Sequence, residues 1–142
     1  MAAINPYLNF NGNTEEAFNF YKSVFGGSFA ALMRYKDTPE AAKVPAGEQE
    51  KIMHMALPIG TNILMGTDTL ASMGHHVQQG THMSISVTAA SNDEAIAVFN
   101  GLSGGGQVTV PFQEMSWGDH FGMLTDQFGV QWMVSYTPGR QS

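Results

Sequence analysis

The chain has 142 residues, a formal net charge of −6 and a hydrophobic fraction of 43%, which is ordinary for one globular domain. It contains no cysteine, which excludes disulfide frameworks, thiolate metal sites and cysteine nucleophiles. Its six basic residues are scattered, so we expect no nucleic-acid partner, and no apolar run approaches the ~20 residues of a membrane span. The N-terminus also lacks the pattern of a signal peptide, which predicts a cytoplasmic protein without a membrane partner.

The first half of the chain predicts a strand, a helix and three more strands. Residues 4–10 alternate apolar and polar side chains, which is typical of a strand with one apolar face. A helix over 14–25 is expected, because Asn13 and Glu16 form a capping-box pattern and glycines follow at the other end. Further strands are predicted at 28–35, 52–59 and 62–65. The polar loop 37–50 is the best candidate for a mobile lid.

The second half repeats the first. Residues 15–27 align without a gap with residues 93–105, and the match includes both helix ends. The repeat predicts a helix over 92–103 and strands at 81–87, 107–112, 120–125 and 131–136. The predicted fold is therefore α+β: a single domain over 1–142, with two β-α-β-β-β modules at about 1–68 and 81–137 and a linker at about 69–80.

Strand alternation also divides the residues between two faces. One face is apolar and must pack on the helices, whereas the other carries Asn, Tyr, His and Ser without charge. An uncharged, mildly polar face is typical of a ligand pocket, and a plain solvated sheet face is the alternative. The residues expected to form the pocket are Asn5, Tyr7, Asn9, His54, His82, Ser84, Trp117 and Met133.

The segments 5–27 (NPYLNFNGNTEEAFNFYKSVFGG) and 117–133 (WGDHFGMLTDQFGVQWM) resemble the PhnB-like branch of the vicinal oxygen chelate superfamily. That superfamily includes glyoxalase I, bleomycin-resistance proteins and extradiol dioxygenases. The resemblance implies that both modules form a cupped, barrel-like mixed sheet, with the helices outside and the site inside.

The resemblance also implies where metal ligands would lie. They fall on Asn5, His82, Met133, and either Leu64 or its neighbour Met65. Only His82 is a good ligand for a hard divalent cation, since thioether and alkyl groups cannot bind one. We therefore expect no metal site, no cofactor, and neither glyoxalase I nor extradiol dioxygenase activity.

Three functions stay open at this point. The first is a metal-independent protein that binds a small molecule in the sheet cavity. The second is an enzyme, of lyase, isomerase or dioxygenase-like type, that uses His82 as an acid/base or as the remaining metal anchor. The third is a purely structural interaction module. A methyltransferase is disfavoured because no glycine-rich nucleotide-binding loop precedes a helix. A homodimer is expected because the chain carries few charges and its sheets have edge strands that need cover.

Overall fold

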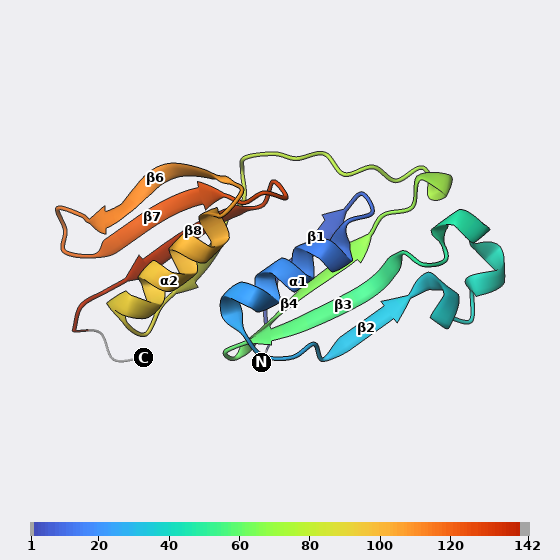
Figure 1. Cartoon of the computed structure of the whole chain (residues 1–142), viewed down its shortest axis with the longest axis horizontal. Coiled ribbons are helices and arrows are strands. Elements are labelled where there is room, and N and C mark those ends of the chain that lie inside the picture. The colour runs from blue at the N-terminus through green and yellow to red at the C-terminus, as the bar shows by residue number, and fades with distance from the viewer. Residues whose placement is uncertain (1, 140–142) are drawn as a thin grey trace. The chain divides into compact units, whose positions relative to one another are not determined.

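The computed structural model describes residues 2–139, and the chain divides into two compact units, one up to Gln78 and one from Gln79 onwards (Figure 1). Each unit holds one α-helix and one four-stranded mixed sheet, which confirms the α+β fold of repeated β-α-β-β-β modules. The grouping of both modules into one domain stays a prediction. The first unit contains β1 (Tyr7–Phe10), α1 (Thr14–Phe25), β2 (Ala31–Arg34), β3 (Ile52–Ile59) and β4 (Asn62–Asp68). The second contains β5 (Ile85–Thr88), α2 (Asn92–Ser103), β6 (Gln107–Glu114), β7 (His120–Thr125) and β8 (Gln131–Tyr136).

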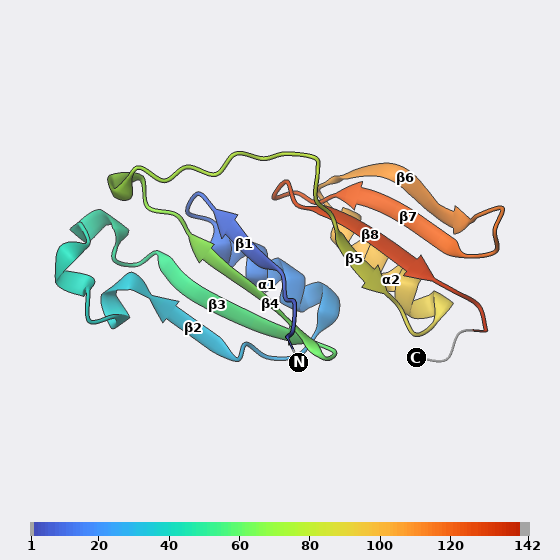
Figure 2. The same ribbon diagram turned by 180° about the vertical axis from the view of Figure 1, so that it is seen from behind.

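The two sheets have the same topology. Their strand orders are β1-β4-β3-β2 and β5-β8-β7-β6. In each sheet the first strand pairs in parallel with the last, and the remaining pairs are antiparallel. In each unit the helix covers one face of the sheet, and the other face carries no helix of the described residues (Figure 2).

The core of the first unit lies between α1 and the sheet. Ala17, Phe18 and Tyr21 repeat at helical spacing on α1 and are fully buried. The Phe18 ring lies so close to Gly66 on β4 that a Cβ on this glycine would come within 2.6 Å of it. Phe10 of β1 packs edge-on against Phe18, with ring centroids 6.4 Å apart.

The second unit repeats this packing with different side chains. Ala95, Phe99 and Leu102 of α2 are buried against the sheet. Gly122 of β7 lies under the Phe99 ring, where an added Cβ would come within 2.6 Å of a ring carbon. The fully buried Trp132 donates its indole N–H to a carboxylate oxygen of Asp126 at 2.8 Å, so the only polar atom of this side chain is satisfied.

Both helices have the predicted bounds, but only α2 begins with the predicted kind of cap. Ser91 accepts a hydrogen bond from the Glu94 amide at 3.1 Å. The side chain of Asn13, in contrast, makes no capping bond. The amide and hydroxyl of Thr14 instead donate to Oδ1 of Asp68, from the end of β4, at 3.0 and 2.7 Å.

The first strand of each module is shorter than predicted. β5 begins at Ile85 and not at residue 81, since Ile85 pairs with Trp132 and β8 itself begins one residue earlier. β1 begins at Tyr7 and not at residue 4. β2 is also shorter than predicted, whereas β4 and β6 run on to Asp68 and Glu114.

The loop 37–50 contains short 3-10 turns and internal hydrogen bonds. The Gln49 side-chain amide donates to the carbonyl oxygens of Ala41 and Val44, both at 3.2 Å. Lys36 and Glu50, at its two ends, form an ion pair at 2.7 Å. Its role as a mobile lid stays a prediction. Over residues 2–139, neither helix is long and apolar enough to cross a membrane.

Candidate functional site

The open face of the first sheet carries no charged side chain from its strands. Because Gly66 faces α1, its neighbours Met65 and Thr67 on β4 face the other way. The strand register places Tyr7 beside Met65 and Asn9 beside Thr67, so these side chains share the open face. The Arg34 side chain lies on the helix side of the sheet, where its guanidinium donates a hydrogen bond to the carboxylate of Glu15 on α1 at 2.8 Å. The predicted uncharged face is therefore present on this sheet.

Tyr7 and His54, both predicted as pocket residues, lie together on this face. The Tyr7 hydroxyl hydrogen-bonds Nδ1 of His54 at 3.3 Å, and the ring centroids are 5.8 Å apart. The phenol donates when the imidazole carries its proton on Nε2. Tyr7 is on the edge strand β1 and His54 is on β3, so the pair spans β4. A hydroxyl and an imidazole are thus presented side by side on an otherwise weakly polar surface.

Burial raises the pKa of the Tyr7 phenol, and the neighbouring Tyr35 adds to this effect. A hydrogen bond with Thr67 acts in the opposite direction but does not cancel the rise. Although 46% of Tyr7 is exposed, its hydroxyl end lies against other side chains. The phenol therefore stays protonated at neutral pH and can serve as a hydrogen-bond donor.

The Asn5 side chain forms hydrogen bonds within the fold that the sequence did not predict. Its side-chain oxygen accepts hydrogen bonds from the Ile63 amide at 2.9 Å and from the Asn62 side chain at 3.3 Å. These bonds fasten the chain before β1 to the start of β4, beyond the point where the strand ladder ends. Asn9, in contrast, is exposed on the open face beside Thr67.

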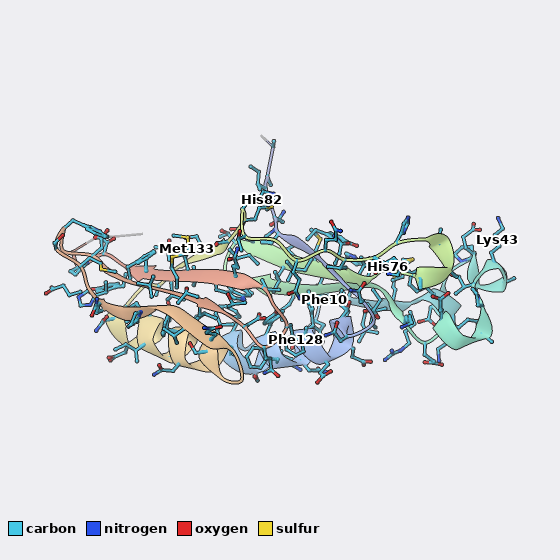
Figure 3. All side chains as sticks on the ribbon, turned by 90° about the horizontal axis from the view of Figure 1, so that it is seen from above. Phe10, Lys43, His76, His82, Phe128 and Met133 are labelled. Carbon is cyan, nitrogen blue, oxygen red and sulfur yellow. The ribbon has the colours of Figure 1, made fainter. Side chains whose placement is uncertain are left out.

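The second sheet presents methionine on its open face. Gly122 faces α2 and pairs with Val134, so the next pair along the strands, Met123 and Met133, lies on the opposite side. Ser86 is the register partner of Met133 on β5. Figure 3 shows Met133 on the side of the sheet away from α2. This face, too, is uncharged over Ser86, Met123 and Met133.

The other predicted residues of the second unit lie outside strands. His82 and Ser84 are exposed in the segment before β5 (Figure 3 labels His82), and Met83 between them is 74% exposed. The Gln131 side chain donates to the Met83 carbonyl at 2.6 Å and takes the place of a ladder bond. Trp117 is 67% exposed in the tight turn between β6 and β7.

The residues at the implied metal positions do not suit a hard divalent cation. The Asn5 side-chain oxygen already accepts two hydrogen bonds within the first unit. Of the two candidates on β4, Leu64 is buried and only Met65 is on the open face. Met65 and Met133 offer thioether sulfur, which is a ligand for soft metals. Among residues 2–139 no three His, Asp or Glu side chains cluster closely enough to hold an ion.

Sequence reasoning missed part of the surroundings of Tyr7. Thr67 was not considered, because the fourth strand was expected to end at Met65, two residues earlier. Tyr35 lies beyond β2 and donates its hydroxyl to the Asp68 carbonyl at 3.0 Å. Thr67 lies two residues after Met65, so the two-residue period of a strand that continued would have placed it on the same face, whereas nothing local in the sequence points to Tyr35.

The sequence matches one family over nearly its whole length. The family model described as 3-demethylubiquinone-9 3-methyltransferase covers residues 2–135.

Solved structures agree with this match. The chain is 39% identical to protein PA1353 from Pseudomonas aeruginosa, with a TM-score of 0.85 and coverage of 96% of this chain and 98% of that one. A putative 3-demethylubiquinone-9 3-methyltransferase, the PhnB protein from Bacillus cereus, is 26% identical, with a TM-score of 0.77 and coverage of 96% and 100%. A glyoxalase-related enzyme from Fulvimarina pelagi shares the fold, with 15% identity, a TM-score of 0.65 and coverage of 97% and 90%.

Proposed function

Because this chain belongs to the family described as 3-demethylubiquinone-9 3-methyltransferase, a PhnB-like branch of the vicinal oxygen chelate superfamily, we propose that it binds a small organic molecule without that superfamily's metal. The ligand contacts the open face of the first sheet, with Tyr7 and His54 as its main polar contacts. The observation that carries this proposal is the hydrogen-bonded pair of Tyr7 and His54 at 3.3 Å on an uncharged sheet face. Such a surface fits a ligand that is mostly apolar and carries one or two polar groups.

The donor set supports the part of the proposal that concerns metal. A hard cation needs several oxygen or imidazole ligands, and two of the four implied positions hold thioethers. A methionine instead adapts its shape to an apolar ligand. Met65, which shares the open face of the first sheet with Tyr7, therefore contributes packing surface to the proposed site.

The methyl-transfer activity in the family's description is not part of the proposal. A methyl donor with a nucleotide part would need a binding loop, commonly a glycine-rich segment that opens a helix. The segments 11–13 and 89–91 precede the two α-helices of the described residues, and neither is glycine-rich. The alternative of an enzyme centred on His82 has less support, because His82 is exposed and lies outside the sheet.

The proposal is tested by screening metabolites for a rise in melting temperature and by measuring the affinity of the hits by calorimetry. Tyr7→Phe removes one hydroxyl and keeps the ring, so we expect the affinity to fall about fivefold. His54→Ala is expected to weaken binding further. Prior treatment with a chelator should leave the affinity of the unsubstituted protein unchanged.

Two variants serve as controls for this experiment. Asn19→Ala changes an exposed residue of α1, on the covered side of the sheet, and should leave affinity unchanged. His82→Ala separates the two functions: if it abolishes binding while Tyr7→Phe does not, the His82-centred alternative is correct. A hit that binds only to protein with one tightly held divalent ion per chain would also contradict the proposal.

A further inference from the structure

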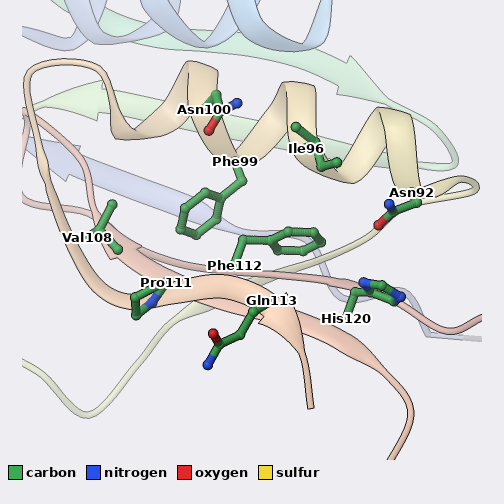
Figure 4. Close-up of a pocket in the computed structure, with 9 residues that line it drawn as sticks. All are labelled: Asn92, Ile96, Phe99, Asn100, Val108, Pro111, Phe112, Gln113 and His120. Carbon is green, nitrogen blue, oxygen red and sulfur yellow. The ribbon is translucent and has the colours of Figure 1, made fainter.

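The second unit contains a pocket that the proposed site does not use. It has a volume of about 470 Å³ and lies between α2 and the edge strand β6, on the helix side of the sheet (Figure 4). Phe99 and Phe112 form its inner wall, whereas Met133 lies on the opposite face of the same sheet. The lining residues are Asn92, Ile96, Phe99, Asn100, Val108, Pro111, Phe112, Gln113 and His120.

Most of the pocket wall is apolar or aromatic. The Phe99 and Phe112 ring centroids are 5.6 Å apart, and the ring of His120 stacks on Phe112 at 6.2 Å with an angle of 28°. Ile96 and Val108 are 40% and 42% exposed, although both are large apolar side chains. A wall of this kind gains free energy when an apolar or aromatic group covers it.

One polar atom in the pocket has no partner. The side-chain oxygen of Asn92, the first residue of α2, is buried and accepts no hydrogen bond from the residues that the structure describes. Ser91 already caps the helix, so Asn92 is not needed for that purpose. Figure 4 shows Asn92 and His120 at the same end of the pocket. A buried acceptor without a donor is unfavourable, so a ligand with an N–H or O–H group at this end would satisfy it.

The charged residues of the second unit favour a ligand whose hydrogen-bond donor is positively charged. Between residues 79 and 139 there is no Lys or Arg, whereas the acidic residues are Asp93, Glu94, Glu114, Asp119 and Asp126. The carboxylate of Glu114 lies 3.9 Å from Nε2 of His120 at the pocket. The first turn of α2 carries Asp93 and Glu94, which offset the positive end of the helix dipole. This field favours a cation over an anion.

We propose that the pocket binds a small aromatic amine with an alkyl linker. Its ammonium group donates to the Asn92 side-chain oxygen, and its ring packs on Phe112 between Ile96 and Val108. This inference does not depend on the proposed function, because the pocket lies in the second unit, the pair of Tyr7 and His54 lies in the first, and the two sites share no residue.

Three probes of nearly equal size isolate the role of charge. Phenethylamine, 2-phenylethanol and phenylacetate share a benzene ring and differ in the terminal group. Titrations followed by two-dimensional ¹⁵N NMR in 0.15 M salt should show the amine binding most tightly, the alcohol at least threefold more weakly and the acid not measurably. The Asn92 side-chain amide and the backbone amides of 96–100, Phe112 and Gln113 should shift.

A matched pair of substitutions tests the location. Ile96→Lys places a positive charge in the pocket at an exposed helix position, and we expect at least a tenfold loss of affinity for phenethylamine. Ala97→Lys adds the same charge at the next exposed position of α2, which does not line the pocket, and should change affinity less than twofold. Asn92→Asp introduces a charged acceptor at a position where helices favour Asp, so it should bind the amine severalfold more tightly.

Three results would overturn this inference. The first is phenylacetate binding as tightly as the amine. The second is an equal loss of affinity in Ile96→Lys and Ala97→Lys. The third is amine-induced shifts that map to the open sheet faces, around Tyr7 or Met133, and spare Asn92.

Discussion

Asp68 shows how much one buried side chain holds together. Its two carboxylate oxygens accept hydrogen bonds from the amide and hydroxyl of Thr14 and, at 2.8 Å, from the Ile52 amide. It is only 2% exposed. One carboxylate at the end of β4 thus caps α1 and also binds the first residue of β3.

Replacement of Asp68 by Ala should therefore destabilise the protein strongly. It leaves three buried donors without an acceptor, so we expect the free energy of unfolding to fall by about 3 kcal/mol. The measurement is urea unfolding followed by far-UV circular dichroism. Asn13→Ala is the matched control, because Asn13 has the sequence position of a cap but makes no capping bond. Equal losses in the two variants would contradict this account of the cap.

At the scale of elements, each helix approaches its sheet over a glycine. Gly66 lies under Phe18 in the first unit, and Gly122 lies under Phe99 in the second. Neither glycine has a positive φ, so the requirement for glycine comes from space and not from backbone conformation. The close approach lets an aromatic ring fill the volume that a side chain on the strand would occupy.

Gly122→Ala is expected to destabilise the second unit by about 2 kcal/mol through overpacking. The added Cβ would lie 2.6 Å from the Phe99 ring and 2.8 Å from the Phe112 Cα, and the latter belongs to the backbone of β6 and cannot easily move. Thermal unfolding by calorimetry measures the effect. Gly47→Ala, where no atom lies within 4 Å of the added Cβ, should change the melting temperature little. A Gly122→Ala variant as stable as the unsubstituted protein would show that the helix can shift.

At the scale of the whole molecule, both sheets end in strands with an unpaired side. β1 and β2 are the outer strands of the first sheet, and β5 and β6 are those of the second. Such edges are commonly covered by another chain or element. The basic residues are also unevenly distributed, because every described Lys and Arg belongs to the first unit.

We therefore expect a homodimer in solution. Light scattering at micromolar concentration should report twice the 15.3 kDa mass of one chain. The mass should persist in 0.5 M salt, because a chain with so few charges has mostly uncharged surface to bury. A mass equal to one chain would reject the dimer.

Much of the fold could be predicted from local sequence patterns. The bounds of both helices, and of β3, β7 and β8, are those expected, because capping residues, glycines and strict alternation are encoded within a few residues. Alternation also predicted that Tyr7 and His54 share a face, whereas their hydrogen bond depends on the order of the strands. Strand ends were harder to predict, since the end of a strand depends on where its partner ends. His82 was therefore expected on a strand that begins three residues later.

The sequence by itself thus determined the repeat, the helices and the uncharged character of the sheet faces, all of which depend on neighbouring residues. The tertiary structure decided which polar groups serve the fold and which are left for a ligand. The side chains of Asn5 and Asp68 accept hydrogen bonds from backbone amides of distant segments. The Asn92 side-chain oxygen, in contrast, has no partner among residues 2–139. The physical reason is that contacts between elements decide which polar groups become hydrogen-bond partners. The same local pattern of residues is compatible with many different contacts between elements.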